Sequence, residues 1–203
     1  MEDVRAAVVR WVSSSAGPQD VSTQVAAALR LLREPLSEDK LASVSLLAEH
    51  VRPSRQVSAS ELFPRLAPVF DEGHLADWNT VDLLSVKVLA AWLADEGEDC
   101  AQLLVEWSTA PSMGRRPAAA LAFVPLAPRG DDAFPGLADA LLRICSRNMQ
   151  DPARFSQTSV GWSLRELSKA QPDRVGGFVE QWSDRLSGEA RKAATRFLPA
   201  VPG

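Results

Sequence analysis

The feature that most constrains the fold is a series of helix-breaking clusters at short intervals along the chain. They combine proline, glycine and aspartate, as in AGPQD, REPLSED, VRPSRQ, DEGHLAD, TAPSMG, APRGDD and QDPAR. Such residues end one helix and cap the next. Between the clusters, apolar residues recur at helical spacing, and no run has the alternating β-branched and aromatic residues typical of a strand. The sequence therefore predicts an all-α protein.

The short loops predict antiparallel neighbours, because there is little chain in which to turn in any other way. We expect helices over 3–15, 21–33, 38–51, 59–70, 78–95, 98–108, 115–127, 132–148, 152–169, 172–185 and 187–198. Helices of this length in pairs favour an α-solenoid of the HEAT type, whose repeats span about 40–47 residues, over an irregular bundle. A chain of 203 residues suits one domain or one continuous stack of repeats.

Composition excludes several classes of protein. The apolar runs are shorter than the ~20 residues of a membrane span, and the N-terminus has no pattern of a signal peptide. Two cysteines, Cys100 and Cys145, give no disulfide framework and suit a reducing cytoplasm. His50 and His74 are isolated from other ligand types, so we expect no metal site.

Charge is divided unevenly along the chain. Residues 1–109 hold 9 Lys and Arg against 17 Asp and Glu, a net charge of −8. Residues 110–203 hold 13 against 9, a net charge of +4, and the two sum to the overall −4. Because binding depends on the local field, the C-terminal half is the part suited to a polyanion.

One aromatic side chain lies on an unexpected face of the predicted helix 152–169. On a helical wheel, Trp162 falls opposite the apolar stripe, beside Thr158, Arg165 and Lys169. One interpretation is that this face packs on the next helix pair and buries the tryptophan. The other is that Trp162 lines a concave surface, with cations around it, that contacts sugar or phosphate.

The predicted helix 78–95 is apolar on almost every side, as expected of a buried helix. Asp77 is placed to cap its N-terminus, but Asp82 lies beyond that role and one turn after Trp78. A carboxylate there could form a buried ion pair with an arginine of a neighbouring helix. Alternatively, a partly desolvated carboxylate beside an aromatic ring could stabilise a developing cation or position water.

The segment SMGRRP places two arginines at a helix start. Pro117 fits a first helical turn, so the helix should begin near Arg115 or Arg116. An anion is favoured at that end of the helix dipole, and the partner could be Asp82 or a phosphate. Either arginine could equally be a solvated surface charge.

Four segments in this order resemble the AlkD-like DNA alkylation repair family: DWNTVD, VEWSTAPSMGRRPAAALAF, SVGWSLRELSKAQPDRVGGFVE and LSGEARKAATRFLP. The similarity runs from about Glu38 to Pro199 and leaves 1–37 as N-terminal helices of unclear role. The resemblance implies one domain over 1–203, an α-solenoid of HEAT-like repeats with a concave surface that faces DNA.

For function, the resemblance implies a DNA glycosylase acting on duplex DNA. Such an enzyme removes alkylated, positively charged purines, of the 3-methyladenine or 7-methylguanine type, by hydrolysing the N-glycosidic bond in base excision repair. It uses no metal or cofactor. The resemblance also implies a monomer in the bacterial cytosol or nucleoid.

The resemblance assigns catalysis to one carboxylate and two aromatic side chains: Asp82, Trp78 and Trp162. It assigns phosphate contacts to arginines: Arg116 or its neighbour Arg115, with Arg165 in support. Lys169 and Thr158, which share the face of Trp162, complete the predicted DNA-binding set.

Two positions depart from the family pattern. Met113 stands where an aromatic residue commonly precedes the arginine pair, and Thr158 stands where a lysine is usual. An alternative function is a non-catalytic HEAT-like scaffold that binds DNA or a protein partner. The retained set favours the enzyme, because a scaffold has no need to assemble it: Trp78, Asp82, Arg115 or Arg116, and Trp162.

Overall fold

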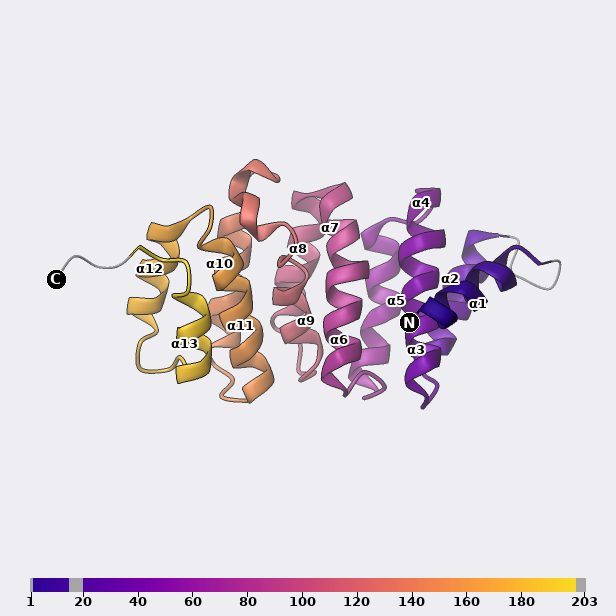
Figure 1. Cartoon of the computed structure of the whole chain (residues 1–203), viewed down its shortest axis with the longest axis horizontal. Helices are drawn as coiled ribbons and strands as arrows, with labels where there is room; N and C mark the ends of the chain where they lie inside the picture. Colours follow the sequence, from indigo (N-terminus) through magenta and orange to yellow (C-terminus); the bar gives the residue numbers. More distant parts are fainter. Residues whose placement is uncertain (1, 15–19, 200–203) are drawn as a thin grey trace.

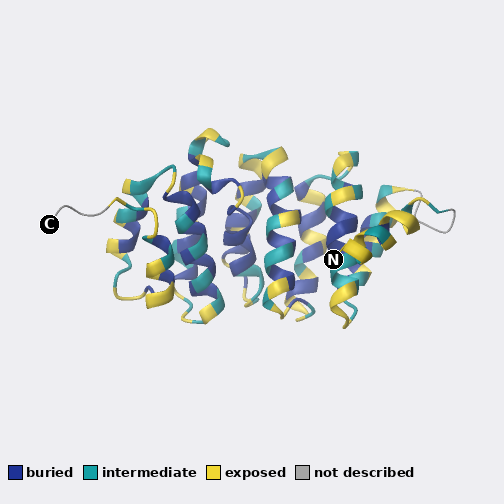
Figure 2. Cartoon of the chain, in the orientation of Figure 1, coloured by how far each residue is buried: buried dark blue, intermediate teal, exposed yellow. Residues whose placement is uncertain are grey.

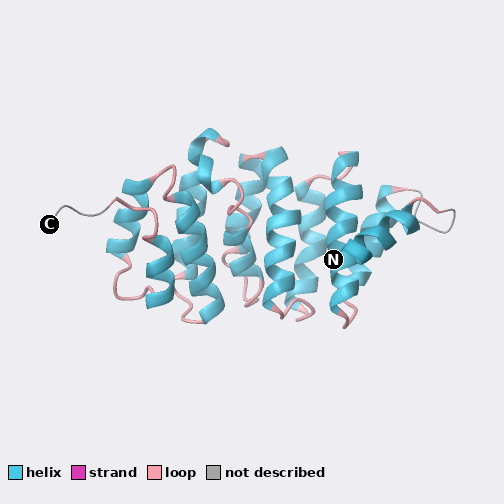
Figure 3. Cartoon of the chain, in the orientation of Figure 1, coloured by secondary structure: helices cyan, strands magenta, loops and turns pink. Residues whose placement is uncertain are grey.

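The computed structural model describes residues 2–14 and 20–199, and helices and turns make up the whole of that part (Figure 3). The prediction of an all-α protein is therefore confirmed. No helix among these residues is long and apolar enough to cross a membrane.

The helices follow one another with short connections. In chain order they are α1 (Glu2–Val12), α2 (Val21–Leu31), α3 (Ser37–Leu46), the π-helix η1 (Leu47–Val51), α4 (Arg52–Ser54), α5 (Ala59–Asp71), α6 (Trp78–Leu84), the π-helix η2 (Ser85–Leu89), α7 (Ala90–Glu96), α8 (Glu98–Trp107), α9 (Arg115–Leu121), the 3₁₀-helix η3 (Ala127–Asp132), α10 (Leu137–Asn148), α11 (Arg154–Leu167), α12 (Pro172–Gln181) and α13 (Gly188–Ala194). Most of the predicted helices are present with similar bounds.

The helices form two layers along one axis (Figure 1). One layer contains α3, α6, α9, α11 and α13, in which each helix packs on the next. The other contains α2, α5, α8, α10 and α12, and α1 crosses the N-terminal end at an angle. This arrangement of stacked pairs is a helical repeat fold, as predicted.

The hydrophobic core runs between the two layers, where buried residues face one another (Figure 2). Its largest fully buried side chains include Phe63 and Phe123. Near the C-terminus, the close approach of α11 and α13 requires glycine. A Cβ added at Gly161 would lie 2.7 Å from Cα of Ala190, so no larger residue fits there. By contrast, α1 is mostly exposed and buries only Val8.

Four predicted helices, 115–127, 132–148, 172–185 and 187–198, are shorter in the structure, and the last two end at Gln181 and Ala194. The first, α9, ends at Leu121, ahead of Pro125, which lacks the backbone N–H that a helix needs. The second starts at residue 137, after the 3₁₀-helix η3. Within η3, Gly130 has a φ of 53°, a conformation that interrupts a helix and favours glycine.

A π-helical segment that the sequence did not predict lies in the helix over 78–96. It is η2, between α6 and α7, and it follows directly after the turn that carries Asp82. The extra residue in a π turn changes the direction of side chains on either side of it, and such segments are frequent at functional sites.

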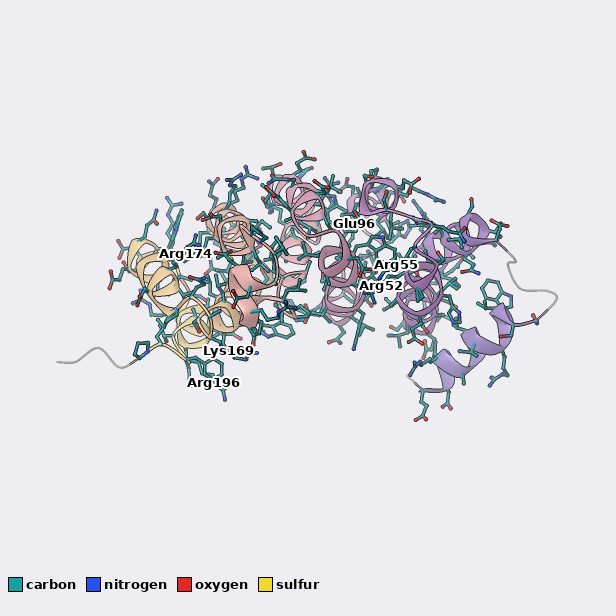
Figure 4. All side chains as sticks on the ribbon, turned by 90° about the horizontal axis from the view of Figure 1, so that it is seen from above. Arg52, Arg55, Glu96, Lys169, Arg174 and Arg196 are labelled. Carbon is teal, nitrogen blue, oxygen red and sulfur yellow. The ribbon has the colours of Figure 1, made fainter. Side chains whose placement is uncertain are left out.

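The molecule is curved when seen from above (Figure 4). Helix α1 at one end and the C-terminal helices at the other lean toward the same side, which we call the inner face. Lys169 and Arg196 lie on this side, whereas Arg174 lies away from it. The inner face is formed by the layer that contains α6 and α11.

Candidate functional site

The first turn of α6 presents a tryptophan and a carboxylate together. Oδ1 of Asp77 accepts a hydrogen bond from the backbone N–H of Thr80 at 2.8 Å, which confirms the predicted cap. The cap fixes the start of the helix at Trp78. Asp82 follows one turn later, so the two side chains are neighbours on one side of the helix.

Asp82 is a half-buried carboxylate with no cationic partner. Within the described part of the chain, its Oδ1 is buried without a hydrogen-bond partner, and it forms no salt bridge. Burial raises the pKa of Asp82 to about 6, an effect that a hydrogen bond from Trp78 partly offsets. The group therefore carries its negative charge at neutral pH at a site where that charge is costly.

The alternative of an ion pair between Asp82 and a neighbouring arginine is wrong. Arg115 donates through Nη1 to Asp71 at 2.6 Å, and Arg116 donates through Nη2 to Asp151 at 2.7 Å. The two arginine side chains are only 17% and 26% exposed, so neither is a solvated surface charge.

The two arginines have different surroundings. The guanidinium of Arg115 lies 5.4 Å from the ring centroid of Trp107, a core residue. The partner of Arg116, Asp151, also accepts hydrogen bonds from the Ser156 hydroxyl and the Ala153 N–H. Burial raises the pKa of Asp151, but these hydrogen bonds and Arg116 lower it below its usual range. The ion pair between Arg116 and Asp151 thus links α9 to the loop before α11.

Helix α11 carries a stripe of residues that includes Trp162. Phe155 and Trp162 are seven residues apart, which places them on one side of α11. Lys169 follows after seven more residues, in the turn directly after the helix. The ring of Trp78 packs on Phe155, with 3.8 Å between centroids and an interplanar angle of 41°. Lys169 lies on the inner face (Figure 4). The contact between Trp78 and Phe155 places the first turn of α6 beside the first turn of α11.

Trp162 itself is half-buried and lies outside the hydrophobic core. The guanidinium of Arg165 is 5.9 Å from its ring centroid, a cation–π distance. These surroundings argue against the alternative in which Trp162 is a core residue packed on the next helix pair.

A buried carboxylate connects two of the predicted DNA-binding cations. Glu166, 8% exposed, accepts a hydrogen bond from Nε of Arg165 at 2.8 Å and another from Nζ of Lys169. Burial raises the pKa of Glu166, but Lys169 and Arg165 outweigh that effect, and the pKa lies below its usual value. The three side chains together carry a net charge of about +1 at neutral pH.

Thr158 is less suited to its predicted role than the cations are. Its hydroxyl donates to the backbone carbonyl of Arg154 at 2.8 Å. A threonine hydroxyl has a single proton to donate, so a phosphate would have to displace this hydrogen bond.

The sequence did not reveal Phe155 or the three carboxylates that pair with the cations. Phe155 could have been found, because it lies seven residues before Trp162 on the same side of the helix. Asp71 and Asp151 could not, because they are separated from their arginines by 44 and 35 residues.

The described residues contain no group of three His, Cys, Asp or Glu side chains that could hold a metal ion. Both cysteines are buried and unpaired, and burial raises the pKa of each thiol. A thiol in that state is a poor nucleophile, so neither is a candidate for catalysis.

Comparison with known proteins agrees with the architecture. No curated protein matches the chain. The structure is similar to that of a predicted DNA alkylation repair enzyme from Enterococcus faecalis, with a TM-score of 0.74 and 18% sequence identity over 98% of this chain and 83% of that chain. The model of the DNA alkylation repair enzyme family matches residues 1–198, including α1 and α2, which the motifs had left outside. The chain therefore belongs to the DNA alkylation repair enzyme family.

Proposed function

We propose that this protein is a DNA glycosylase that removes alkylated, positively charged purines from duplex DNA, as the first step of base excision repair. The lesions are of the 3-methyladenine and 7-methylguanine type. The observation that carries the proposal is Asp82, a half-buried carboxylate beside Trp78 that no cation among the described residues neutralises.

The reaction needs little from the protein beyond electrostatics and a positioned water. An alkylated purine is already cationic, so the bond from C1′ to the base nitrogen breaks and its electron pair neutralises the leaving base. The deoxyribose becomes cationic at C1′. The carboxylate of Asp82 would stabilise this charge, and the water that attacks C1′ would lose its proton to Asp82 or to solvent.

Aromatic side chains would hold the nucleotide that carries the lesion. Trp78 and Trp162 present partly exposed rings, and Phe155 supports the ring of Trp78. A ring face packs on deoxyribose without reading sequence, which suits an enzyme that must act wherever alkylation occurs.

Cations on the same side would hold the phosphates. We assign this role to Arg116, Arg165 and Lys169, and a packing role to Arg115, because its guanidinium lies against Trp107. Their carboxylate partners hold the side chains in place before DNA arrives. An arginine has five N–H donors, so a guanidinium that binds one carboxylate still has donors for a phosphate.

The ion pairs also favour a second candidate, a non-catalytic scaffold that binds DNA or a protein partner. Arg116, Arg165 and Lys169 each have a carboxylate partner, which weakens the positive field of this side. A scaffold would bind without releasing a base.

The test is release of methylated bases from alkylated duplex DNA by the purified protein, compared with Asp82→Asn. We expect base release by the parent and almost none by the variant. Asp99→Asn, an exposed acidic residue of α8, is the matched control and should act like the parent. Equal release by Asp82→Asn and the parent would refute the role of Asp82. DNA binding without release by the parent would support the scaffold.

A further inference from the structure

The turn after α13 exposes an aromatic ring between two cations. Among the described residues, Phe197 and Trp11 are the two aromatic side chains classed as exposed, and Phe197 is 45% exposed. Nζ of Lys169 lies 4.9 Å from the Phe197 ring centroid, and the guanidinium of Arg196 lies 5.6 Å from it. We call Lys169, Arg196 and Phe197 the Phe197 cluster.

The ring is held in this exposed position by its neighbours. Leu198 packs against the hydrophobic core. The backbone N–H groups of Arg196 and Leu198 donate to the carbonyls of Ala193 and Thr195, both at 3.2 Å. The turn is therefore anchored on both sides of Phe197. Single exposed apolar side chains are common on protein surfaces, so the case for a binding surface depends on the two cations beside the ring.

The Phe197 cluster is continuous with the candidate site. Arg165 lies over Trp162, Glu166 joins Arg165 to Lys169, and Lys169 lies over Phe197. The net charge of these groups is about +2, because Arg196 adds one cation to the net charge of the Glu166 trio. Figure 4 shows Lys169 and Arg196 together on the inner face.

We propose that the Phe197 cluster is a second DNA contact, which binds the sugar–phosphate backbone of one strand beside the lesion. The ring would pack on a deoxyribose or a base, and Lys169 and Arg196 would bind the phosphates on either side. The surface charge favours a polyanion over a protein partner. That the DNA carries an alkylated base rests on the proposed function, but the contact itself does not.

The spacing along α11 gives the position of this contact. Lys169 lies in the turn directly after α11, seven residues after Trp162. At about 1.5 Å per residue for the helical part, the separation along the helix axis is about 10 Å. Nucleotides rise about 3.4 Å each along a strand. The Phe197 cluster should therefore meet the backbone about three nucleotides from the nucleotide held by Trp162.

The first experiment measures the affinity of the full chain for an unmodified duplex, by fluorescence anisotropy over a series of salt concentrations. We expect Phe197→Ala to weaken binding roughly 5- to 30-fold with little change in the salt dependence. Arg196→Ala should instead reduce the slope of log K against log salt concentration by about 0.9, because one phosphate contact is lost. Both variants should melt near the parental temperature, since both side chains are exposed and lie outside the hydrophobic core.

Two variants serve as matched controls. Trp11→Ala removes the other exposed aromatic residue, which lies on α1. Arg185→Ala removes a cation that lies 5.9 Å from the ring centroid of Trp182, a contact of the same kind at the end of α12. Both should bind DNA like the parent. The proposal would be overturned if Phe197→Ala and Arg196→Ala bound DNA with the affinity and salt dependence of the parent. It would also be overturned if the two control variants lost as much affinity as they do.

The second experiment locates the contact. The lesion nucleotide is replaced by an abasic-site analogue, and the duplex is shortened on one side or the other. The affinity of the parent protein should fall when one of the two flanks of the abasic site is shorter than about three base pairs. The affinity of Phe197→Ala should not depend on the length of that flank. An equal response of parent and variant to shortening on both sides would overturn the proposal.

These measurements separate this proposal from the proposed function. If the parent releases no alkylated base while Phe197→Ala binds DNA more weakly, the glycosylase assignment fails and the Phe197 cluster stands. If the parent excises normally and Phe197→Ala binds like the parent, the Phe197 cluster fails and the glycosylase assignment stands.

Discussion

Asp82 on α6 and Glu166 on α11 are both acidic side chains withdrawn from water, yet their surroundings are opposite. Glu166 binds two cations, and its pKa is lowered. Within residues 2–14 and 20–199, no cation pairs with Asp82, and its pKa is raised to about 6. Two cations compensate for the burial of Glu166, so its role is structural. The charge of Asp82 is not compensated in this way, which costs folding free energy. The same charge can stabilise a cationic transition state.

The largest expected effect is on catalysis by Asp82. Asp82→Asn should reduce the rate of excision about 100- to 1000-fold, the usual loss when a group that stabilises transition-state charge is removed. The same variant should be more stable than the parent by about 1–2 kcal/mol at pH 7. One pKa unit corresponds to about 1.4 kcal/mol, and partial exposure reduces the full value. Single-turnover kinetics and thermal melting measure the two effects. An inactive variant that is also less stable would mean that Asp82 is structural.

The second effect is on stability through Glu166. Glu166→Gln should lower the free energy of unfolding by about 1–3 kcal/mol, because Arg165 and Lys169 lose their charged partner beside a buried side chain. Urea denaturation at pH 7 measures this difference. Glu189→Gln, at the exposed ion pair with Arg154, is the control and should change stability by less than about 1 kcal/mol. Equal effects in the two variants would remove the contrast between Glu166 and a surface ion pair.

A third test concerns Trp162, the tryptophan that α11 contributes to the proposed site. Trp162→Ala should cost less than about 1.5 kcal/mol of stability and lower excision roughly 10-fold or more, through loss of a ring face against the sugar. Phe123→Ala, in the core, should cost about 3–5 kcal/mol. Melting temperature and excision rate on one preparation distinguish the cases. A loss of stability like that of Phe123→Ala would show that Trp162 is a core residue.

The smallest effects are in the pH dependence of stability. The pKa of Asp82 is raised in the folded state, so its ionised form destabilises the fold as pH rises from about 4 through 6. The advantage of Asp82→Asn should therefore vanish below about pH 4. The pKa of Glu166 is lowered, so its contribution is present above its ordinary pKa and is lost as pH falls through the folded value. The penalty of Glu166→Gln should persist at pH 5. Denaturation curves of the parent and both variants at several pH values measure these stability differences. If the differences for Asp82→Asn and Glu166→Gln changed over the same pH range, the contrast between the two carboxylates would be contradicted.

Excision should follow the ionisation of the same carboxylate. Because the proposed mechanism needs Asp82 ionised, the rate should fall about tenfold per pH unit below about 6. A rate that stays constant down to pH 5 would contradict the role of Asp82, whatever the stability measurements show.

Much of this site was predictable from local sequence. The wheel placed Trp162 beside Arg165 and away from the apolar stripe, and the spacing of four residues placed Trp78 beside Asp82. Those predictions depend only on helical geometry, which is the same in every fold. Phe155 follows the same rule, since its spacing of seven from Trp162 puts it on the stripe.

The partners of the charges were not predictable in the same way. Arg115 could have bound Asp82, and the sequence alone left that possibility open. In the structure it binds Asp71, which is 44 residues away, and Arg116 binds Asp151. Such contacts depend on how α5, α9 and α11 are stacked.

The sequence by itself therefore determined where most helices lie, the cap at Asp77 and the faces on which the functional side chains lie. Each of these depends on interactions between residues a few positions apart. Only the tertiary structure decided that the four cations predicted from the sequence to bind phosphate each have a carboxylate partner, and that Asp82 has no cationic partner among the described residues. That outcome depends on desolvation and on distances between separate helices, which the stacking of the repeats sets.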